Sequence, residues 1–156
     1  MLSIWTWTRN HRQHHKYTDT DADPHNADRG FFYSHIGWIL YPKHPECKAK
    51  HRTIDVRDVM ADPVARFQFR HYLKLVALIG FVLPTALPVL LWGESWLYAF
   101  ALCVGFRFCL STHNICLINS AAHLYGTKPY NRKLMPSENL FVTYLSLGEG
   151  KLIFKH

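Results

Sequence analysis

Two long runs of apolar residues dominate the middle of the chain. Residues 75–92, LVALIGFVLPTALPVLLW, carry no charge, and with the two residues before them they reach the roughly 20 positions that a helix needs to cross a hydrocarbon core. After the turn sequence GES, a second apolar stretch runs over 96–118 and contains Arg107 and His113. The pattern predicts a transmembrane helical hairpin at 73–118. The alternative is a soluble helical hairpin buried in a core.

Polar regions flank this hairpin on both sides. The stretch 43–52, KHPECKAKHR, is expected to be a basic loop that contains proline. The stretch 56–75, VRDVMADPVARFQFRHYLKL, is typical of an amphipathic helix at the membrane interface, or of a plain surface helix. The sequence therefore predicts three regions: a cytosolic region with an interfacial helix at 1–72, the hairpin at 73–118, and a second cytosolic segment at 119–156.

The distribution of charge supports the membrane interpretation. The chain has 156 residues, a length typical of one domain, and a formal net charge of +7 although 49% of its residues are hydrophobic. Of its 18 Lys and Arg residues, twelve precede Leu75, none lies in the turn at 93–95, and five follow the second apolar stretch. Under the positive-inside rule, both flanks are cytoplasmic and the turn is lumenal.

The N-terminal and cysteine patterns favour a reducing compartment. The first residues lack the basic and apolar regions of a secretory signal peptide. The four cysteines form no C-x-x-C pair, so we expect buried thiols. They are Cys47, Cys103, Cys109 and Cys116.

Three histidines near the N-terminus form the pattern H-x-x-H-H. On a helix, His11, His14 and His15 lie on one face, so that their imidazoles can converge on one point. Neutral imidazole binds iron, copper, nickel or zinc. The pattern therefore indicates a metal site, and the alternative is a solvated, histidine-rich surface.

The aspartates that follow do not form a calcium loop. Asp19, Asp21 and Asp23 open like an EF-hand, but Pro24 and Gly30 stand where the turn glycine and the closing glutamate are required. These carboxylates are instead expected to cap helices or to accept hydrogen bonds from ligating imidazoles and so fix their orientation.

A second polar motif follows the hairpin. In NSAAHLYG at 119–126, Asn119 and His123 lie one helical turn apart, separated by small residues that would allow a helix or a ligand to come close. Together with the H-x-x-H-H pattern on the same side of the membrane, this motif predicts a second group of ligands for one metal centre.

These motifs resemble the membrane-bound acyl-CoA desaturases of the stearoyl-CoA Δ9 type. HRQHHKYTDTDADPHNADRGFFYSHIGWIL is similar to the family's second histidine box, NSAAHLYGTKPYN to the segment after its last transmembrane helix, and LPTALPVLLWGES to the hairpin between them. The resemblance implies an all-α membrane protein of the endoplasmic reticulum, with two of the family's four transmembrane helices and a cytosolic helical histidine-box region.

The resemblance also implies a chemistry. In this family, two histidine-bound irons activate O2 and a cis double bond is inserted into a saturated acyl-CoA, with electrons from cytochrome b5 and its NADH-dependent reductase. The implied metal ligands are His11, His14, His15 and His123, with Asn119 acting through water, and no catalytic residue beyond them is implied. The implied substrate-binding residues are Arg9 and Lys43 at the coenzyme A head group and Trp7 along the acyl tunnel. At three further substrate-binding positions the chain departs from the family: Asn10 replaces an aspartate at the head group, and Ile115 and Cys116 replace a threonine and a tryptophan of the tunnel wall.

The ends of the chain differ from the family pattern. The family's first histidine box should precede His11, and its third should follow LGEG at 147–150, where this chain continues KLIFKH. We therefore expect a truncated member that ligates at most one iron well and is inactive by itself, with no ligand role for His156. Two other functions remain open: a non-catalytic membrane protein that pairs with a full-length desaturase, and a related histidine-box hydroxylase. No nucleic-acid partner is expected.

Overall fold

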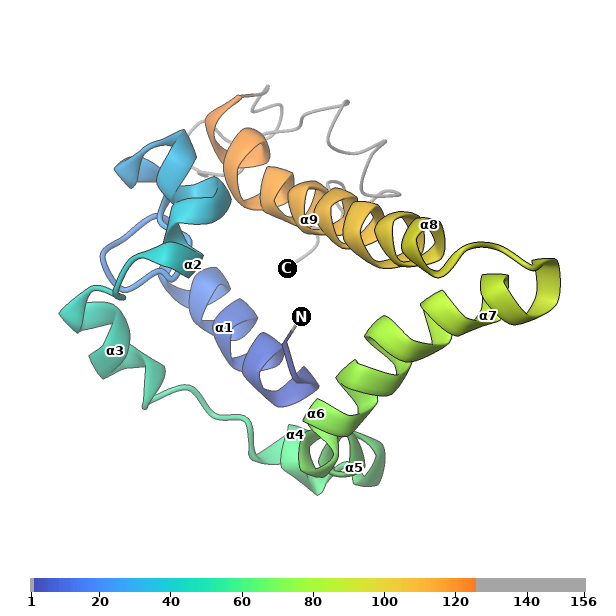
Figure 1. Cartoon of the computed structure of the whole chain (residues 1–156). Helices are drawn as coiled ribbons and strands as arrows, with labels where there is room; N and C mark the ends of the chain where they lie inside the picture. Colours follow the sequence, from blue (N-terminus) through green and yellow to red (C-terminus); the bar gives the residue numbers. More distant parts are fainter. Residues whose placement is uncertain (1, 126–156) are drawn as a thin grey trace. The chain divides into compact units, whose positions relative to one another are not determined.

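The computed structural model describes residues 2–125, and every regular element in that range is a helix (Figure 1). In chain order the elements are α1 (Ile4–Tyr17), η1 (Ala27–Arg29), η2 (Tyr33–Gly37), α2 (Trp38–Leu40), α3 (Pro45–His51), α4 (Arg57–Ala61), α5 (Pro63–Arg70), α6 (Tyr72–Leu75), η3 (Val76–Val82), α7 (Leu83–Trp92), α8 (Trp96–Phe100), η4 (Ala101–Phe106) and α9 (Arg107–Leu124). Here η1 is a 3₁₀ turn, and the other η elements are π-helical. The described residues form two units, one of 2–9 with 55–111 and one of 10–54 with 112–125.

Two long apolar helices confirm the predicted hairpin helices. Tyr72–Trp92 and Trp96–Leu124 are both long and apolar enough to cross a membrane, with mean hydropathies of 2.3 and 1.5. Only 11% of each apolar window is buried inside the chain, which disfavours the alternative of a soluble buried hairpin. The second helix continues past residue 118, the expected end of the hairpin, so Asn119 and His123 lie on the same helix as the second apolar stretch.

The turn between these helices is built by two local signals. Gly93 ends α7 in the left-handed conformation (φ 68°), which glycine adopts at little cost. Ser95 then caps α8, because its side chain accepts a hydrogen bond from the Tyr98 N–H at 3.3 Å. The GES sequence therefore both ends one helix and begins the next.

Arg107 lies within the second apolar stretch, and backbone carbonyls accept hydrogen bonds from its charged side chain. Its guanidinium donates to the carbonyl of Cys103 at 2.7 Å and to the carbonyl of Gly80 at 2.9 Å. Both carbonyls belong to π-helical segments, η4 and η3, where the regular helical hydrogen-bond ladder is altered. The charge is thus satisfied by the backbone of both helices.

Two expectations about the polar flank are wrong. The stretch 43–52 is largely helical, because Pro45 occupies the first turn of α3, where its missing N–H costs nothing. The stretch 56–75 is not one helix but three, α4, α5 and α6. The extended backbone of Asp62 ends the first of them, and its side chain caps the second by accepting from the N–H groups of Val64 and Ala65, both at 2.8 Å.

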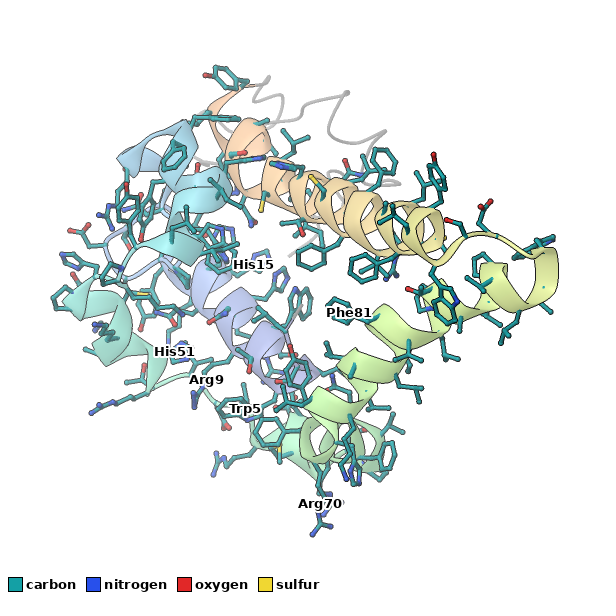
Figure 2. All side chains as sticks on the ribbon, in the orientation of Figure 1. Trp5, Arg9, His15, His51, Arg70 and Phe81 are labelled. Carbon is teal, nitrogen blue, oxygen red and sulfur yellow. The ribbon has the colours of Figure 1, made fainter. Side chains whose placement is uncertain are left out.

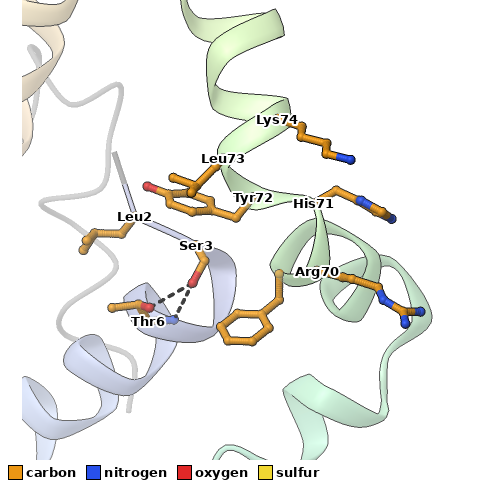
Figure 3. Close-up of a pocket in the computed structure, with 9 residues that line it drawn as sticks. Leu2, Ser3, Thr6, Arg70, His71, Tyr72, Leu73 and Lys74 are labelled. Carbon is orange, nitrogen blue, oxygen red and sulfur yellow. Dashed lines mark hydrogen bonds between the residues drawn. The ribbon is translucent and has the colours of Figure 1, made fainter.

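The first unit also contains a hollow of about 480 Å³ beside the start of α1 (Figure 3). Ser3 caps α1 there: its Oγ accepts from the Thr6 N–H at 3.2 Å and lies 2.9 Å from the Thr6 hydroxyl. The other lining residues are Leu2 and residues 69–74. The sequence predicts no chemistry for these residues, so we do not assign the hollow to the candidate site.

Gln13 is the central buried residue of the second unit. It is 0% exposed, and its Nε2 donates to the carbonyls of Ala22 at 2.7 Å and Cys47 at 2.8 Å. Its Oε1 lies 2.7 Å from Nδ1 of His51, which is labelled in Figure 2. One side chain of α1 therefore joins the loop at 18–26 and the helix α3.

The cysteine prediction is correct only in part. All four cysteines are free, and Cys47 and Cys116 are buried. Cys109, however, is exposed, because it lies on the outer surface of the long apolar α9.

Candidate metal centre

The three histidines of the H-x-x-H-H pattern lie together on the last turns of α1. Nε2 of His11 and Nε2 of His15, the latter labelled in Figure 2, are 3.1 Å apart. The ring of His14 is 5.6 Å from the ring of His15, measured between centroids. The helical spacing therefore gathers the imidazoles, as the sequence predicts.

A fourth imidazole comes from α9, far away in the sequence. The ring centroid of His123 lies 5.1 Å from that of His14. Asn119 lies one turn before His123 on the same helix and is half-buried. The fold thus brings two sequence motifs to one place within the second unit.

Two buried carboxylates hold the two central imidazoles. Both oxygens of Asp23 lie 2.9 Å from Nδ1 of His14, and Oδ2 of Asp19 lies 3.1 Å from Nδ1 of His123. A carboxylate on one ring nitrogen fixes the ring's orientation and makes the other nitrogen a better metal donor. In both histidines that other nitrogen is Nε2.

The loop at 18–26 is built around these carboxylates. Asp23 accepts from the N–H groups of Asp19 and His25, both at 2.8 Å, and Asp19 accepts from the Ala27 N–H at 3.0 Å. Asp19 itself has a positive φ of 56°, a left-handed conformation that aspartate tolerates better than most residues. Asp21, in contrast, is exposed and takes no part in this network of backbone hydrogen bonds.

The surroundings favour the neutral, metal-binding form of His11. Burial, followed by the charges of His15 and His14, lowers the pKa of His11 to about 4. Burial and the charge of His14 lower the pKa of His25 to about 3. Burial acts to raise the pKa of Asp19, but the hydrogen bond and charge of His123 outweigh it, and the pKa is lowered. Neutral imidazoles beside ionised carboxylates are the donor set that iron accepts in proteins.

The predicted head-group residues are brought together in part. Nζ of Lys43 donates to Oδ1 of Asn10 at 3.2 Å in the second unit. In the first unit, the Arg9 guanidinium lies 4.0 Å above the Trp5 ring, and Trp7 is 51% exposed. Lys43 therefore has a polar neighbour, and Arg9 an aromatic one.

The two predicted tunnel residues on α9 differ in their environment. Ile115 is 58% exposed, whereas Cys116 is 2% exposed. The carbonyl of Cys116 accepts from the Ser120 hydroxyl at 2.8 Å. The two side chains therefore lie on different faces of α9.

Sequence reasoning missed His25 and the contact between His35 and His113. His14, Asp23 and His25 offer ligand atoms that all lie within 4.8 Å of one another, and His25 stands in the same ADPHN sequence as Asp23. His35 Nε2 and His113 Nδ1 are 2.9 Å apart, although 78 positions separate the two residues. Proximity in the sequence could have indicated His25, but no sequence signal indicates the second pair.

Comparison with known proteins decides the family. Residues 1–150 match the fatty acid desaturase family. The chain belongs to this family. This desaturase-family chain is 51% identical over 154 residues to the acyl-CoA Delta12-desaturase of Acheta domesticus, an alignment that covers 99% of the chain and 43% of the relative.

Two further relatives are named as a Delta(9)-fatty-acid desaturase and a stearoyl-CoA desaturase. The chain is 49% identical over 150 residues to the Delta(9)-fatty-acid desaturase fat-6 of Caenorhabditis elegans, covering 96% of the chain and 44% of the relative. It is 47% identical over 153 residues to stearoyl-CoA desaturase 5 of Bos taurus, covering 98% of the chain and 46% of the relative. The desaturase-family chain thus spans less than half of the length of these curated relatives.

Proposed function

We propose that this chain carries part of the di-iron centre of an acyl-CoA desaturase, which inserts a cis double bond into a saturated acyl-CoA. The observation that supports this most strongly is the pairing of two imidazoles from distant motifs, His14 and His123, each with a buried aspartate on its Nδ1. When bound, the irons supply O2 activation. The names of the relatives, which are acyl-CoA and fatty-acid desaturases, support the substrate class.

In this proposal the four imidazoles ligate iron and the aspartates orient them. The proposed ligands are His11, His14, His15 and His123, with Asn119 acting through water. Asp23 and Asp19 would each hold one Nδ1–H, so that Nε2 stays unprotonated and turned toward the metal. The donor set fits iron, because neutral imidazole with a carboxylate partner is one of its preferred ligands.

A second set of residues, given by the family resemblance, is proposed to bind the substrate. Arg9, Asn10 and Lys43 would bind the phosphates of coenzyme A, and the hydrogen bond from Lys43 to Asn10 orients the ammonium group for this role. Trp7, Ile115 and Cys116 would line the path of the acyl chain. We propose insertion at the Δ9 position, although the relatives' names include Delta(11) and Delta12 enzymes as well.

The proposed location is the endoplasmic reticulum membrane. The regions 1–72 and 119–156 would both face the cytoplasm. In the sequence they precede and follow a membrane hairpin at 73–118. Cytochrome b5 and its NADH-dependent reductase would supply electrons on that side. The helix α5 supports an interfacial position, because Val64 and Phe67 are 69% and 57% exposed immediately before the first apolar helix.

The products formed in desaturase-deficient yeast test this function. The protein that contains this chain is expected to restore growth and to form palmitoleate and oleate. Double bonds at other positions would correct the Δ9 assignment but keep the desaturase function, and hydroxylated acids would favour a hydroxylase. An acyl composition identical to that of the empty-vector strain, with the protein present in the membrane, would contradict the proposal.

A further inference from the structure

The Asp23 carboxylate lies between two imidazoles, and the proposed function uses only one of them. Its oxygens are 2.9 Å from Nδ1 of His14, and its Oδ1 is 4.0 Å from Nδ1 of His25. The side chain of Asp23 is 0% exposed and that of His25 is 10% exposed. His25 is therefore a buried polar residue beside the centre without an assigned role.

Packing, rather than a hydrogen bond, fixes the ring of His25. Its edge meets the Trp38 ring at a centroid distance of 4.2 Å, with the planes at 83°, and it meets the His14 ring at 5.4 Å. Its Nδ1 has no hydrogen-bond partner within residues 2–125. The ring thus stands between Trp38 and the pair formed by His14 and Asp23.

The three residues have the composition of a two-histidine, one-carboxylate metal site, but the hydrogen bonds of Asp23 argue against one. Its Oδ1 accepts from the His25 N–H at 2.8 Å and its Oδ2 from the Asp19 N–H at 2.8 Å, and both face Nδ1 of His14. A carboxylate oxygen has about two acceptor positions. Each oxygen therefore accepts one backbone N–H and the two share the N–H of His14, so Asp23 has little capacity left to bind a metal.

We propose that His25 is a positioning residue of the metal centre, which closes the hydrogen bond between Asp23 and His14 off from water and so holds His14 in its ligating orientation. This inference rests on the proposed function. A hydrogen bond to a charged group is stronger when water is excluded, because the local dielectric is low. The aromatic wall of His25 and Trp38 supplies that exclusion.

A cobalt titration of the full chain in detergent micelles tests the role of His25. Co²⁺ is the probe, because its visible absorption spectrum reports both affinity and ligand geometry. Loss of a residue that supports a metal ligand from outside the coordination sphere typically costs roughly 10-fold in metal affinity or more. His25→Ala is therefore expected to raise the Kd for Co²⁺ about 10-fold and to shift the absorption spectrum. His25→Phe keeps the aromatic wall and is expected to stay within about threefold of the original chain.

The same titration separates this inference from the proposed function. His71→Ala, a substitution in the first unit, serves as the matched histidine control. If His14→Ala leaves cobalt binding unchanged, the proposed centre itself fails. If His14→Ala abolishes binding while His25→Ala has no effect, only the role of His25 fails.

Two further outcomes bear on His25 alone. Phenylalanine keeps an aromatic ring but lacks the ring nitrogens of His25. If His25→Phe loses as much cobalt affinity as His25→Ala, these nitrogens contribute to metal binding, and a role through packing is wrong. Circular dichroism of the metal-free variants checks that they fold. If His25→Ala does not fold, His25→Ser takes its place, because it too is small and admits water, with the same expected rise in Kd of about 10-fold and the same contradiction if none occurs.

Discussion

Asp19 and Asp23 each hold one ring nitrogen of a histidine that comes from a different helix. Asp23 is the more deeply buried of the two, with 2% of its surface exposed against 7% for Asp19. Its two oxygens face Nδ1 of His14 and accept two backbone N–H groups. A change at Asp23 therefore affects both the loop and the imidazole.

Replacing Asp23 by asparagine tests the role of the negative charge. Asp23→Asn keeps the size of the side chain but loses its charge and one acceptor, so His14 should lose its orientation. Loss of a residue that hydrogen-bonds to a metal ligand typically lowers metal affinity about 10- to 100-fold. We therefore expect the affinity for Co²⁺ to fall by that factor in a cobalt titration. Asp21→Asn, in the same loop but exposed, should bind cobalt like the original chain. Equal affinities for both variants would contradict the role of Asp23.

At the scale of the elements, α1 carries both the proposed metal ligands and a residue of the proposed head-group site. One side carries His11 and His15, and Gln13 points to the loop at 18–26 and to α3. Asn10, one turn before His14 on the same helix, contacts Lys43. The position of α3, and with it the proposed head-group lysine, therefore depends on the same helix as the metal ligands.

Replacing Gln13 tests this connection. Gln13→Met keeps the length of the side chain but removes its hydrogen bonds to Ala22, Cys47 and His51 and leaves two carbonyls without that donor. Since a buried hydrogen bond contributes about 1 kcal/mol and an unsatisfied buried group costs more, we expect a loss of about 3 kcal/mol in the free energy of unfolding. Denaturant unfolding in detergent, followed by circular dichroism, measures it. Lys16→Met on the same helix is exposed and should change stability little; an equal loss for both would contradict the role of Gln13.

The helices were predictable from the sequence where a repeating pattern specifies them. The apolar runs gave the long helices, and the spacing of His11, His14 and His15 gave their common face. The helix at 45–51 is hard to predict, because proline is typical of loops but also favours the first turn of a helix. The break in 56–75 was missed because Asp62 and Pro63 are together a cap and a first helical residue.

The contacts of the site were less predictable than the helices. Aspartates as partners of imidazoles were one of two expected roles, but their pairing with His14 and His123 depends on a loop in which Asp19 adopts a positive φ. Such a conformation cannot be read from one sequence. Long-range contacts such as that of His35 with His113 lack any local signal.

At the scale of the whole molecule, the chain combines two kinds of surface. The two apolar helices leave most of their side chains uncovered by the chain, as a lipid environment requires. The second unit instead buries polar groups such as Gln13, Asp23 and Ser34, and satisfies them with internal hydrogen bonds. A membrane anchor that carries a polar, histidine-rich centre is the arrangement that the fatty acid desaturase family and the proposed function both require.

The central claim is that His14 and His123, from opposite ends of the described chain, ligate one metal centre. X-ray absorption at the iron edge, on the full chain loaded anaerobically with Fe²⁺, tests it most directly, because imidazole ligands give a recognisable scattering pattern. We predict imidazole-bound iron whose imidazole signal falls in both His14→Ala and His123→Ala, and remains in the control His71→Ala. An iron spectrum without imidazole scattering, or one that neither substitution changes, would contradict the account.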